Sequence, residues 1–256
     1  MKKAILVVSF GTSYKDTFKK NIAVVEDRIR KEYGEYEVRR AFTSGMIIKS
    51  LAEKGFYVDD VPLALKKLEK DGYDEVYIAP THIIAGDEYE KAAALSEEYK
   101  DRFKVLKTGR PLIYSTDDME RIISVLMKEI NIDKESALVF MGHGTEHYVN
   151  TVYGALDYMF KEKGYVNVFV GAVEAYPSLD NVIGLVKKAG YKKAVLTPFM
   201  LVAGDHANND MAGDENSWKS AFTENGIKTD VIMKGLGEYA GIQELYIKHI
   251  KMYLGI

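Results

Sequence analysis

YKKAVLTPFMLVAGDH, residues 191–206, repeats YDEVYIAPTHIIAGDE, residues 73–88, without a gap and at an offset of 191 − 73 = 118. Both copies pass through a proline and reach an Ala-Gly-Asp triplet. A second pair of segments, VVSFGT at residues 7–12 and FMGHGT at residues 140–145, matches at an offset of 140 − 7 = 133. The chain therefore consists of two halves that are built alike and joined by loops of different length.

The two halves differ at positions that carry titratable side chains. Glu88 ends the first Ala-Gly-Asp segment, whereas His206 ends the second. Phe10 in the first half corresponds to His143 in the second. Related copies that diverge into ionisable groups indicate a place for chemistry, and the histidines place that chemistry in the second half.

Composition restricts the class of protein. The chain has 256 residues, of which 47% are hydrophobic, enough to bury one large core or two small ones, and the repeat favours two. The net charge is 35 − 38 = −3 with both signs interspersed, so we expect neither a nucleic-acid nor a membrane partner. The absence of cysteine excludes disulfides, thiolate metal sites and cysteine-ligated iron–sulfur clusters.

The N-terminus, MKKAILVV, is interpreted as a first strand and not as a leader, because its apolar run is short and ends in a Gly-Thr-Ser turn. No run of about 18 apolar residues is present, which argues against a membrane span. We therefore expect a cytoplasmic protein.

Short β-rich runs alternate with helical patterns in both halves. Such alternation predicts an α/β fold with two Rossmann-like domains, whose parallel sheets are flanked by helices. The expected strands are residues 5–9, 37–42, 75–79, 103–108, 137–141, 166–171, 193–197 and 228–231. The expected helices are residues 17–33, 62–70, 88–99, 150–163, 179–188, 209–224 and 242–254.

The domain boundary is expected after residue 125. Residues 1–125 then form the N-terminal half, and residues 126–256 form the C-terminal half that carries the candidate metal site. The helix and loop over residues 117–134 are the expected hinge. The last helix, about residues 240–256, has no counterpart in the first half, and we expect it to pack back on that half.

Three side chains of metal-binding type follow three different strands of the second half. His143, Glu174 and His206 each come after an expected strand, and His143 lies between two glycines that let the backbone turn sharply. In open parallel sheets, ligands bind beyond the carboxyl ends of the strands. Imidazole and carboxylate are ligands for cobalt, nickel, iron and zinc. Each residue alone is an ordinary polar loop residue, but together they indicate a divalent-metal site.

Other motifs are poorer indicators. HGTEH at residues 143–147 matches a zinc-protease pattern that needs a helix, and the preceding strand and flanking glycines disfavour one. GLGEYAG at residues 235–241 has the wrong spacing for a dinucleotide loop, and no G-x-x-x-x-G-K-[ST] occurs, so we expect no nucleotide. His82, which aligns with Met200, is expected to be hydrogen-bonded and partly buried, and His249 is expected to be solvated.

Seven segments carry a resemblance to a known family: LVVSFGTSY, RAFTSGMII, HIIAGDEYEK, VFMGHG, GAVEAYP, MLVAGDHANNDMAG and DENSWK. Together they resemble the anaerobic cobalt chelatases, single-subunit, ATP-independent class II enzymes that act on sirohydrochlorin in cobalamin (vitamin B12) biosynthesis. The resemblance runs nearly end to end. It implies two Rossmann-like domains related by pseudo-twofold symmetry, with a tetrapyrrole bound in the cleft. It also places the family's metal- and proton-handling residues on His143, Glu174 and His206.

On this interpretation the protein is a lyase that inserts Co²⁺, as substrate metal, into sirohydrochlorin or precorrin-2, with no nucleotide and no iron–sulfur cluster. We expect His143 and His206 to hold the metal, while Glu174 helps to desolvate it and accepts pyrrole protons. His143 is the alternative base. Insertion of Fe²⁺ or Ni²⁺, or a non-catalytic carrier of metal or tetrapyrrole, stays open, and so does a homo-oligomer.

Five residues of the first half are expected to contact the tetrapyrrole. Phe10 and Tyr14 offer apolar contact to the ring plane. Lys49 and Lys54 offer cations to its carboxylates. Glu88, which corresponds to His206, is a candidate for the opposite wall, as a proton acceptor or an outer metal site.

Overall fold

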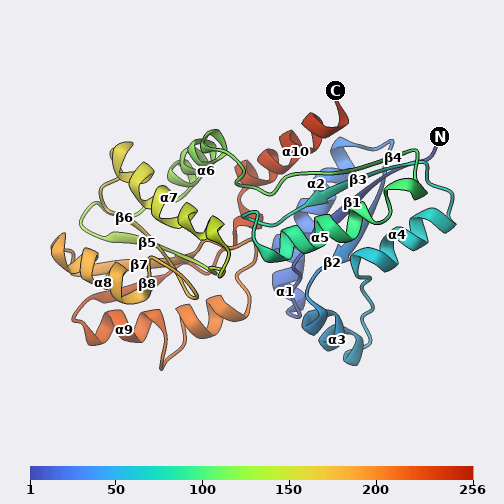
Figure 1. The fold of residues 1–256 in the computed structure, drawn as a ribbon. Coiled ribbons are helices and arrows are strands. Elements are labelled where there is room, and N and C mark those ends of the chain that lie inside the picture. The colour runs from blue at the N-terminus through green and yellow to red at the C-terminus, as the bar shows by residue number, and fades with distance from the viewer. Residues whose placement is uncertain (256) are drawn as a thin grey trace. The chain divides into compact units, whose positions relative to one another are not determined.

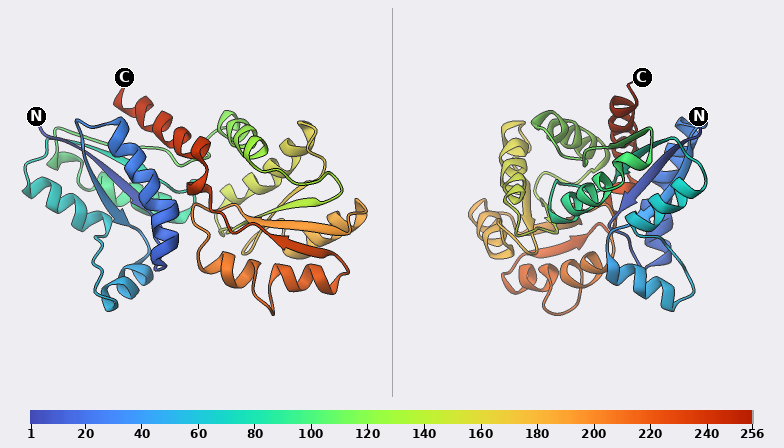
Figure 2. Two further views of the ribbon diagram at one scale, coloured as in Figure 1. Left: turned by 180° about the vertical axis from the view of Figure 1, so that it is seen from behind. Right: turned by 45° about the vertical axis from the view of Figure 1, so that its right-hand side comes forward.

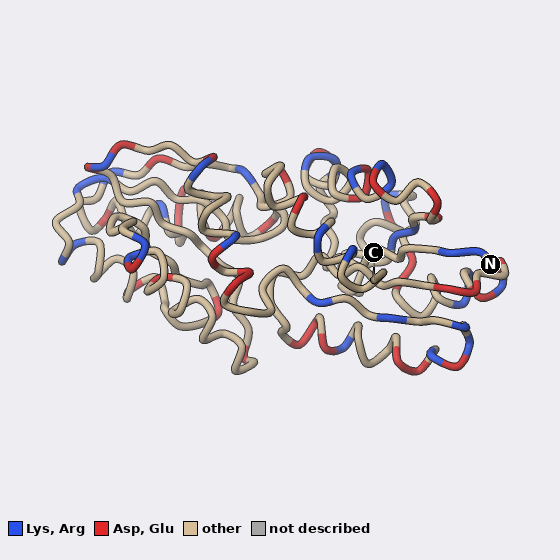
Figure 3. The backbone as a smooth tube through the Cα atoms, turned by 90° about the horizontal axis from the view of Figure 1, so that it is seen from above, with Lys and Arg blue, Asp and Glu red and all other residues tan. Residues whose placement is uncertain are grey.

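The computed structural model describes residues 1–255, which divide into two compact units (Figure 1). Unit 1 contains Met1–Ser115 and the chain from Ala240 onward, and unit 2 is Thr116–Tyr239. No helix among the described residues is long and apolar enough to cross a bilayer. Basic and acidic residues are interspersed along the backbone of each unit (Figure 3).

Unit 1 is built on a four-stranded parallel sheet with the order β2-β1-β3-β4. Its strands are β1 (Lys3–Ser9), β2 (Glu37–Phe42), β3 (Glu75–Pro80) and β4 (Val105–Thr108). Its helices are α1 (Lys15–Thr17), the π-helix η1 (Phe18–Ala23), α2 (Val24–Glu32), α3 (Gly45–Glu53), α4 (Val61–Lys70), α5 (Asp87–Glu97), the 3₁₀ turn η2 (Lys100–Arg102) and α10 (Ala240–Leu254).

Unit 2 repeats this plan, with a parallel sheet in the order β6-β5-β7-β8. Its strands are β5 (Ala137–Gly142), β6 (Val168–Ala172), β7 (Lys193–Pro198) and β8 (Lys228–Val231). Its helices are α6 (Thr116–Glu129), the 3₁₀ turn η3 (Tyr148–Asn150), α7 (Thr151–Glu162), α8 (Leu179–Lys188), the π-helix η4 (Ala207–Met211), α9 (Trp218–Glu224) and the 3₁₀ turn η5 (Leu236–Glu238).

The two sheets agree in register as well as in order. Val8 pairs with Pro80 in unit 1, and Met141 pairs with Pro198 in unit 2. These are corresponding positions of the repeat, since 8 + 133 = 141 and 80 + 118 = 198. The predicted α/β architecture with two parallel sheets is therefore confirmed.

Helices cover both faces of each sheet (Figure 2). In unit 1, Leu6 and its even-numbered neighbours in β1 pack against α4 and α5, and α2 and α10 pack together on the other face. In unit 2, α8 and α9 pack against one face of β5 around Val139. The opposite face carries Phe140, whose ring stacks on Phe160 of α7 with the centroids 5.4 Å apart. Burial of both faces explains why the central strands are continuous apolar runs.

The domain boundary differs from the expected one. The division falls between Ser115 and Thr116, and not after residue 125, because α6 buries Met119, Ile122 and Leu126 within unit 2. The expected hinge at residues 117–134 is thus largely a packed helix. The last helix, α10, contacts α2 and β3 of unit 1. The last helix of each half of the sequence therefore belongs to the unit formed by the other half.

Two helical segments also differ from expectation. Helix α3 was not predicted; Ser44 caps it by accepting a hydrogen bond from the amide of Ile47, and no residue of α3 is buried. The expected helix at residues 209–224 is broken after η4, because Asn216 has a positive φ of 51°. Helix α9 then starts afresh from a capping box at Ser217.

His249 differs from its expected environment, and His82 does so in part, since it is half-buried as expected but not hydrogen-bonded within residues 1–255. His249 is buried in α10 and not solvated. Both ring nitrogens of His82 are shielded from water and have no hydrogen-bond partner within residues 1–255. The nearest ring is that of Tyr89, edge-on, with the centroids 6.2 Å apart. Burial lowers the pKa of His82 to about 4, so the imidazole stays neutral in the folded protein.

We expect His82 to make unit 1 acid-sensitive. An unfolded histidine titrates near pH 6.5, so between that pH and about 4 the unfolded chain binds a proton that the folded chain does not. Stability should fall by up to about 3 kcal/mol as the pH falls through this window. In His82→Met, which installs the residue found at the corresponding position 200 of unit 2, this loss should disappear. Urea unfolding at pH 7.5 and 4.5 measures it, and an unchanged acid dependence in the variant would contradict the assignment.

Candidate functional site

His143 lies immediately beyond β5, in the turn to η3. Its ring nitrogen Nδ1 is 2.7 Å from the backbone carbonyl oxygen of Gly144. A carbonyl oxygen only accepts hydrogen bonds, so Nδ1 must carry the proton and donate it. In the neutral imidazole the other nitrogen, Nε2, then presents its lone pair.

His206 lies at the start of the π-helix η4, after β7. Its Nδ1 is 2.5 Å from Oδ2 of Asp210, one turn further along the chain. An ionised carboxylate also only accepts, so His206 has the same tautomer as His143. Both histidines thus present Nε2 as a potential metal ligand or proton acceptor.

The three predicted residues of unit 2 come together at the carboxyl end of its sheet. The rings of His143 and His206 meet edge to face, with centroids 4.4 Å apart. Oε2 of Glu174 lies 3.8 Å from Nδ1 of His143. The side chains are accessible, with exposed fractions of 40% for His143, 58% for Glu174 and 35% for His206. The cluster is therefore accessible from solvent.

The three side chains of the cluster are not arranged to coordinate a single metal ion. Within residues 1–255, no three His, Asp or Glu side chains form a group that could hold a metal ion as they stand. The histidines are in contact, but Glu174 reaches only toward the protonated side of His143. Its carboxylate would have to turn to join both Nε2 atoms around one ion. The residues present nevertheless suit a borderline divalent metal in their chemistry.

Backbone hydrogen bonds tie the loop of His143 to the loop of Glu174. The amide of Glu174 donates to the carbonyl of His143 at 2.9 Å, and the amide of Val173 donates to Gly142 at 3.0 Å. Gly144 makes this approach feasible, because its φ is +94° and a Cβ there would lie 2.9 Å from Cβ of Ala175. Gly11, its counterpart in unit 1, also has a positive φ, of 106°.

We expect Gly144→Ala to displace Glu174 and lower activity at least about 10-fold, because the added methyl meets backbone atoms that cannot rotate away. The strain should also cost about 1–3 kcal/mol of stability. Gly164→Ala is the matched control, since Gly164 has φ of +89° but open space around it. Initial rates of metal insertion and urea unfolding of both variants test this, and equal rates would contradict it.

The five residues predicted to contact a tetrapyrrole all belong to unit 1. Phe10 and Tyr14 follow β1 and are exposed, so neither is core. Lys49 lies in α3 and Lys54 caps its C-terminus, both with exposed side chains. Glu88 lies in the first turn of α5, and its Oε2 is buried without a hydrogen-bond partner in the described chain. Phe10 and Glu88 occupy in unit 1 the positions of the two histidines in unit 2.

Sequence reasoning missed Asp210 and two exposed aromatic residues that follow α3. Phe56 and Tyr57 are each more than half exposed. The spacing of Asp210, four residues after His206, was not a usable signal, because His206 precedes the expected helix at residues 209–224 and the two side chains were therefore not expected to share a helical face. Nothing in the sequence around Phe56 and Tyr57 marks them as exposed.

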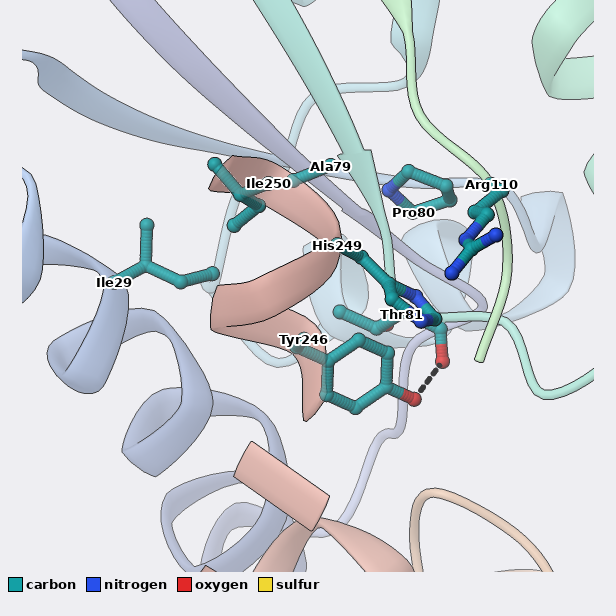
Figure 4. Close-up of a pocket in the computed structure, with 8 residues that line it drawn as sticks. All are labelled: Ile29, Ala79, Pro80, Thr81, Arg110, Tyr246, His249 and Ile250. Carbon is teal, nitrogen blue, oxygen red and sulfur yellow. Dashed lines mark hydrogen bonds between the residues drawn. The ribbon is translucent and has the colours of Figure 1, made fainter. Parts of the chain in front are cut away.

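A small internal cavity lies elsewhere, in unit 1 (Figure 4). Its volume is about 10 Å³, and Thr81, Arg110, Tyr246 and His249 line its polar side. The hydroxyl of Tyr246 donates to the backbone carbonyl of Thr81 at 2.8 Å. Burial raises the pKa of Tyr246, which keeps this hydroxyl protonated as a donor. The cavity is the size of one water molecule, and none of the candidate site residues lines it.

The fold has counterparts among solved structures. SirB from Bacillus subtilis with Fe³⁺ superposes with a TM-score of 0.66 at 13% identity, over 98% of this chain and 95% of that one. SirB from Bacillus subtilis subspecies spizizenii in complex with cobalt gives 0.64 at 14% identity, over 98% and 94%. At such low identity the likeness establishes the fold alone.

Sequence relatives are more specific. The sirohydrochlorin cobaltochelatase of Salmonella typhimurium is 41% identical over 259 residues, covering 100% of this chain and 98% of that protein. The sirohydrochlorin cobaltochelatase CbiKC of Nitratidesulfovibrio vulgaris is 32% identical, over 97% of this chain and 89% of that protein. The family model described as cobalt chelatase (CbiK) matches residues 3–254. This chain, with its paired histidines at the end of a parallel sheet, belongs to the CbiK cobalt chelatase family.

Proposed function

We propose that this chelatase inserts Co²⁺ into sirohydrochlorin, or its precursor precorrin-2, for cobalamin biosynthesis in the cytoplasm. The observation that carries the proposal is the pair of histidines whose ring centroids lie 4.4 Å apart and whose Nδ1 atoms both contact an acceptor oxygen, which leaves Nε2 of each neutral ring free to bind a metal. The cobaltochelatase relatives supply the identity of metal and tetrapyrrole. We further propose that the reaction needs no nucleotide and no iron–sulfur cluster.

The site residues divide the work of the reaction. Metal insertion requires two pyrrole N–H protons to leave while the ion loses water and enters the ring. A neutral imidazole nitrogen can hold the metal or accept a proton, but it cannot do both at once. His143 and His206 therefore hold Co²⁺ through Nε2, and Glu174 accepts the protons. An exposed carboxylate beside His143 is well placed to pass them on to solvent.

Residues of unit 1 complete the substrate contacts in this proposal. Phe10 and Tyr14 contact the ring plane, and Lys49 and Lys54 bind its carboxylates. Glu88 is a second proton acceptor, since one of its carboxylate oxygens has no hydrogen-bond partner within residues 1–255.

Charge reversal at Lys49 and Lys54 should raise the KM for the tetrapyrrole several-fold and leave Co²⁺ binding unchanged; an unchanged KM would remove both from the site.

The decisive experiment follows the visible spectrum of sirohydrochlorin mixed with Co²⁺ and purified protein, without ATP. We expect the spectral change of metal insertion to be much faster than in protein-free buffer. A protein that binds the pigment stoichiometrically but leaves the spontaneous rate unchanged is a carrier and not a chelatase. Parallel assays with Fe²⁺ and Ni²⁺ identify the preferred metal, because imidazole and carboxylate affinities alone do not select cobalt.

A further inference from the structure

Asp210 is the closest polar partner of His206. The carboxylate and the imidazole lie 2.5 Å apart, N to O, and both side chains are only partly exposed. The distance excludes a metal ion shared between these two atoms, because ligands bound at about 2.0–2.2 Å to one ion lie about 3 Å apart. The contact is therefore a direct, charge-assisted hydrogen bond.

The π-helix holds this pair in place. Its wide turn is closed by the amide of Ala212, which donates to the carbonyl of Ala207 five residues earlier at 3.2 Å. Ala207 and Met211 are fully buried and anchor the turn in the core of unit 2. Gly213 has to be glycine, because a Cβ there would lie 2.5 Å from the carbonyl oxygen of Asn209. Asp210 thus reaches His206 from a fixed backbone.

The two histidines of the cluster are oriented by different kinds of acceptor. Nδ1 of His143 donates to a neutral backbone carbonyl, whereas Nδ1 of His206 donates to a carboxylate. A hydrogen bond to an ionised acceptor is about twice as strong as one between neutral groups. A carboxylate behind a ligating histidine fixes its tautomer and makes it a stronger metal ligand.

We propose that Asp210 is a positioning residue for metal capture, which holds His206 in the Nδ1–H tautomer so that Nε2 faces the incoming Co²⁺. The inference rests on the proposed function and extends it. His206 is then the stronger of the two histidine ligands. Asp210 itself touches neither the metal nor the tetrapyrrole.

The test uses the whole protein without tetrapyrrole, with Co²⁺ as the probe. Asp210→Ala should weaken Co²⁺ binding about 10–100-fold. Asp210→Asn keeps the shape of the side chain but not its charge, so its affinity for Co²⁺ should lie between those of Asp210→Ala and the wild type. Asp205→Ala is the matched control: Asp205 accepts from Asn209 at 3.0 Å in the same turn, so its loss tests mere loosening of that turn.

Nitrogen-15 NMR of the histidine rings gives a second readout that needs no metal. The chain has five histidines, so the His206 signal can be assigned with His206→Ala. Wild type and Asp205→Ala should show the Nδ1–H form, and Asp210→Ala should shift toward Nε2–H. Unchanged tautomer and Co²⁺ affinity in Asp210→Ala, or equal losses in Asp205→Ala, would overturn the inference. Failure of the proposed function appears separately, as wild-type insertion rates in His206→Ala.

Discussion

Replacing His206 or His143 by alanine is expected to slow Co²⁺ insertion into sirohydrochlorin at least about 100-fold, the effect typical of losing a positioned base or ligand. Each substitution removes one of the two imidazoles whose rings meet edge to face at the carboxyl end of the unit 2 sheet. The remaining histidine cannot hold the metal firmly while protons leave. Because both side chains are partly exposed, their loss should leave the fold intact.

Stopped-flow or steady-state absorbance at saturating tetrapyrrole measures the effect, with circular dichroism to show that the variants are folded. His147→Ala is the matched control. His147 lies on the same loop as His143, but its Nδ1 accepts a hydrogen bond from the amide of Val149 and caps η3. Its loss should change the insertion rate by less than about 3-fold, in keeping with the modest cost of a lost cap. Wild-type rates in both His143→Ala and His206→Ala would show that the metal is handled elsewhere.

The alternation of β-rich runs with helical patterns was sufficient to predict the two parallel sheets, and the repeat showed which residues of the two halves correspond. Val8 pairs with Pro80 and Met141 pairs with Pro198, so residues at corresponding positions of the repeat are paired in the same register in the two sheets. The same logic brought His143 and His206 together. Central and neighbouring parallel strands end at one edge of a sheet, and the loops that follow them meet there.

The unit in which α6 packs could not be predicted in this way. Helix α6 packs in unit 2, although it follows the last strand of the first half, whereas the last helix was expected to pack on the first half and α10 lies in unit 1. An amphipathic pattern shows that a helix buries a face, but not against which sheet, and tertiary packing decides that. Asp210 was not predicted from the sequence for a related reason. A carboxylate four residues after a histidine is usually a solvated surface residue, and only the short contact distinguishes it.

The two units have the same fold but carry different side chains at the corresponding candidate site positions. Where unit 2 has His143 and His206, unit 1 has Phe10, which is exposed, and Glu88, whose carboxylate is partly buried. The corresponding glycines, Gly11 and Gly144, retain positive φ in both units. Duplication thus preserved the turns that present a side chain beyond the sheet, and the side chains then diverged.

Arg40→Met should destabilise unit 1 by about 2–4 kcal/mol, because it removes the main partner of a buried charge. The carboxylate of Glu26 is 0% exposed and receives a two-pronged contact from Arg40, whose Nε donates to Oε1 at 2.5 Å and whose Nη2 donates to Oε2. Arg30 offers only a longer contact, 3.4 Å, to the same oxygen. The stability of Arg40→Lys should lie between those of Arg40→Met and the wild type, since lysine keeps the charge but cannot make the two-pronged contact. Urea unfolding at pH 7 measures these differences.

The size of that loss reflects the stranded carboxylate and not the worth of the ion pair itself. Desolvating two charges costs about as much as their attraction returns, so replacing both partners by apolar residues should be nearly neutral. Glu26→Leu combined with Arg40→Met is therefore expected to be more stable than Arg40→Met alone, by at least about 1–2 kcal/mol. The methionine can still cover the ring of Phe18, over which the guanidinium now lies at 4.4 Å. A double variant no more stable than Arg40→Met would contradict this expectation. A double variant much less stable than the wild type would show that the pair contributes net attraction and that Glu26 holds α2 on the sheet through that bond.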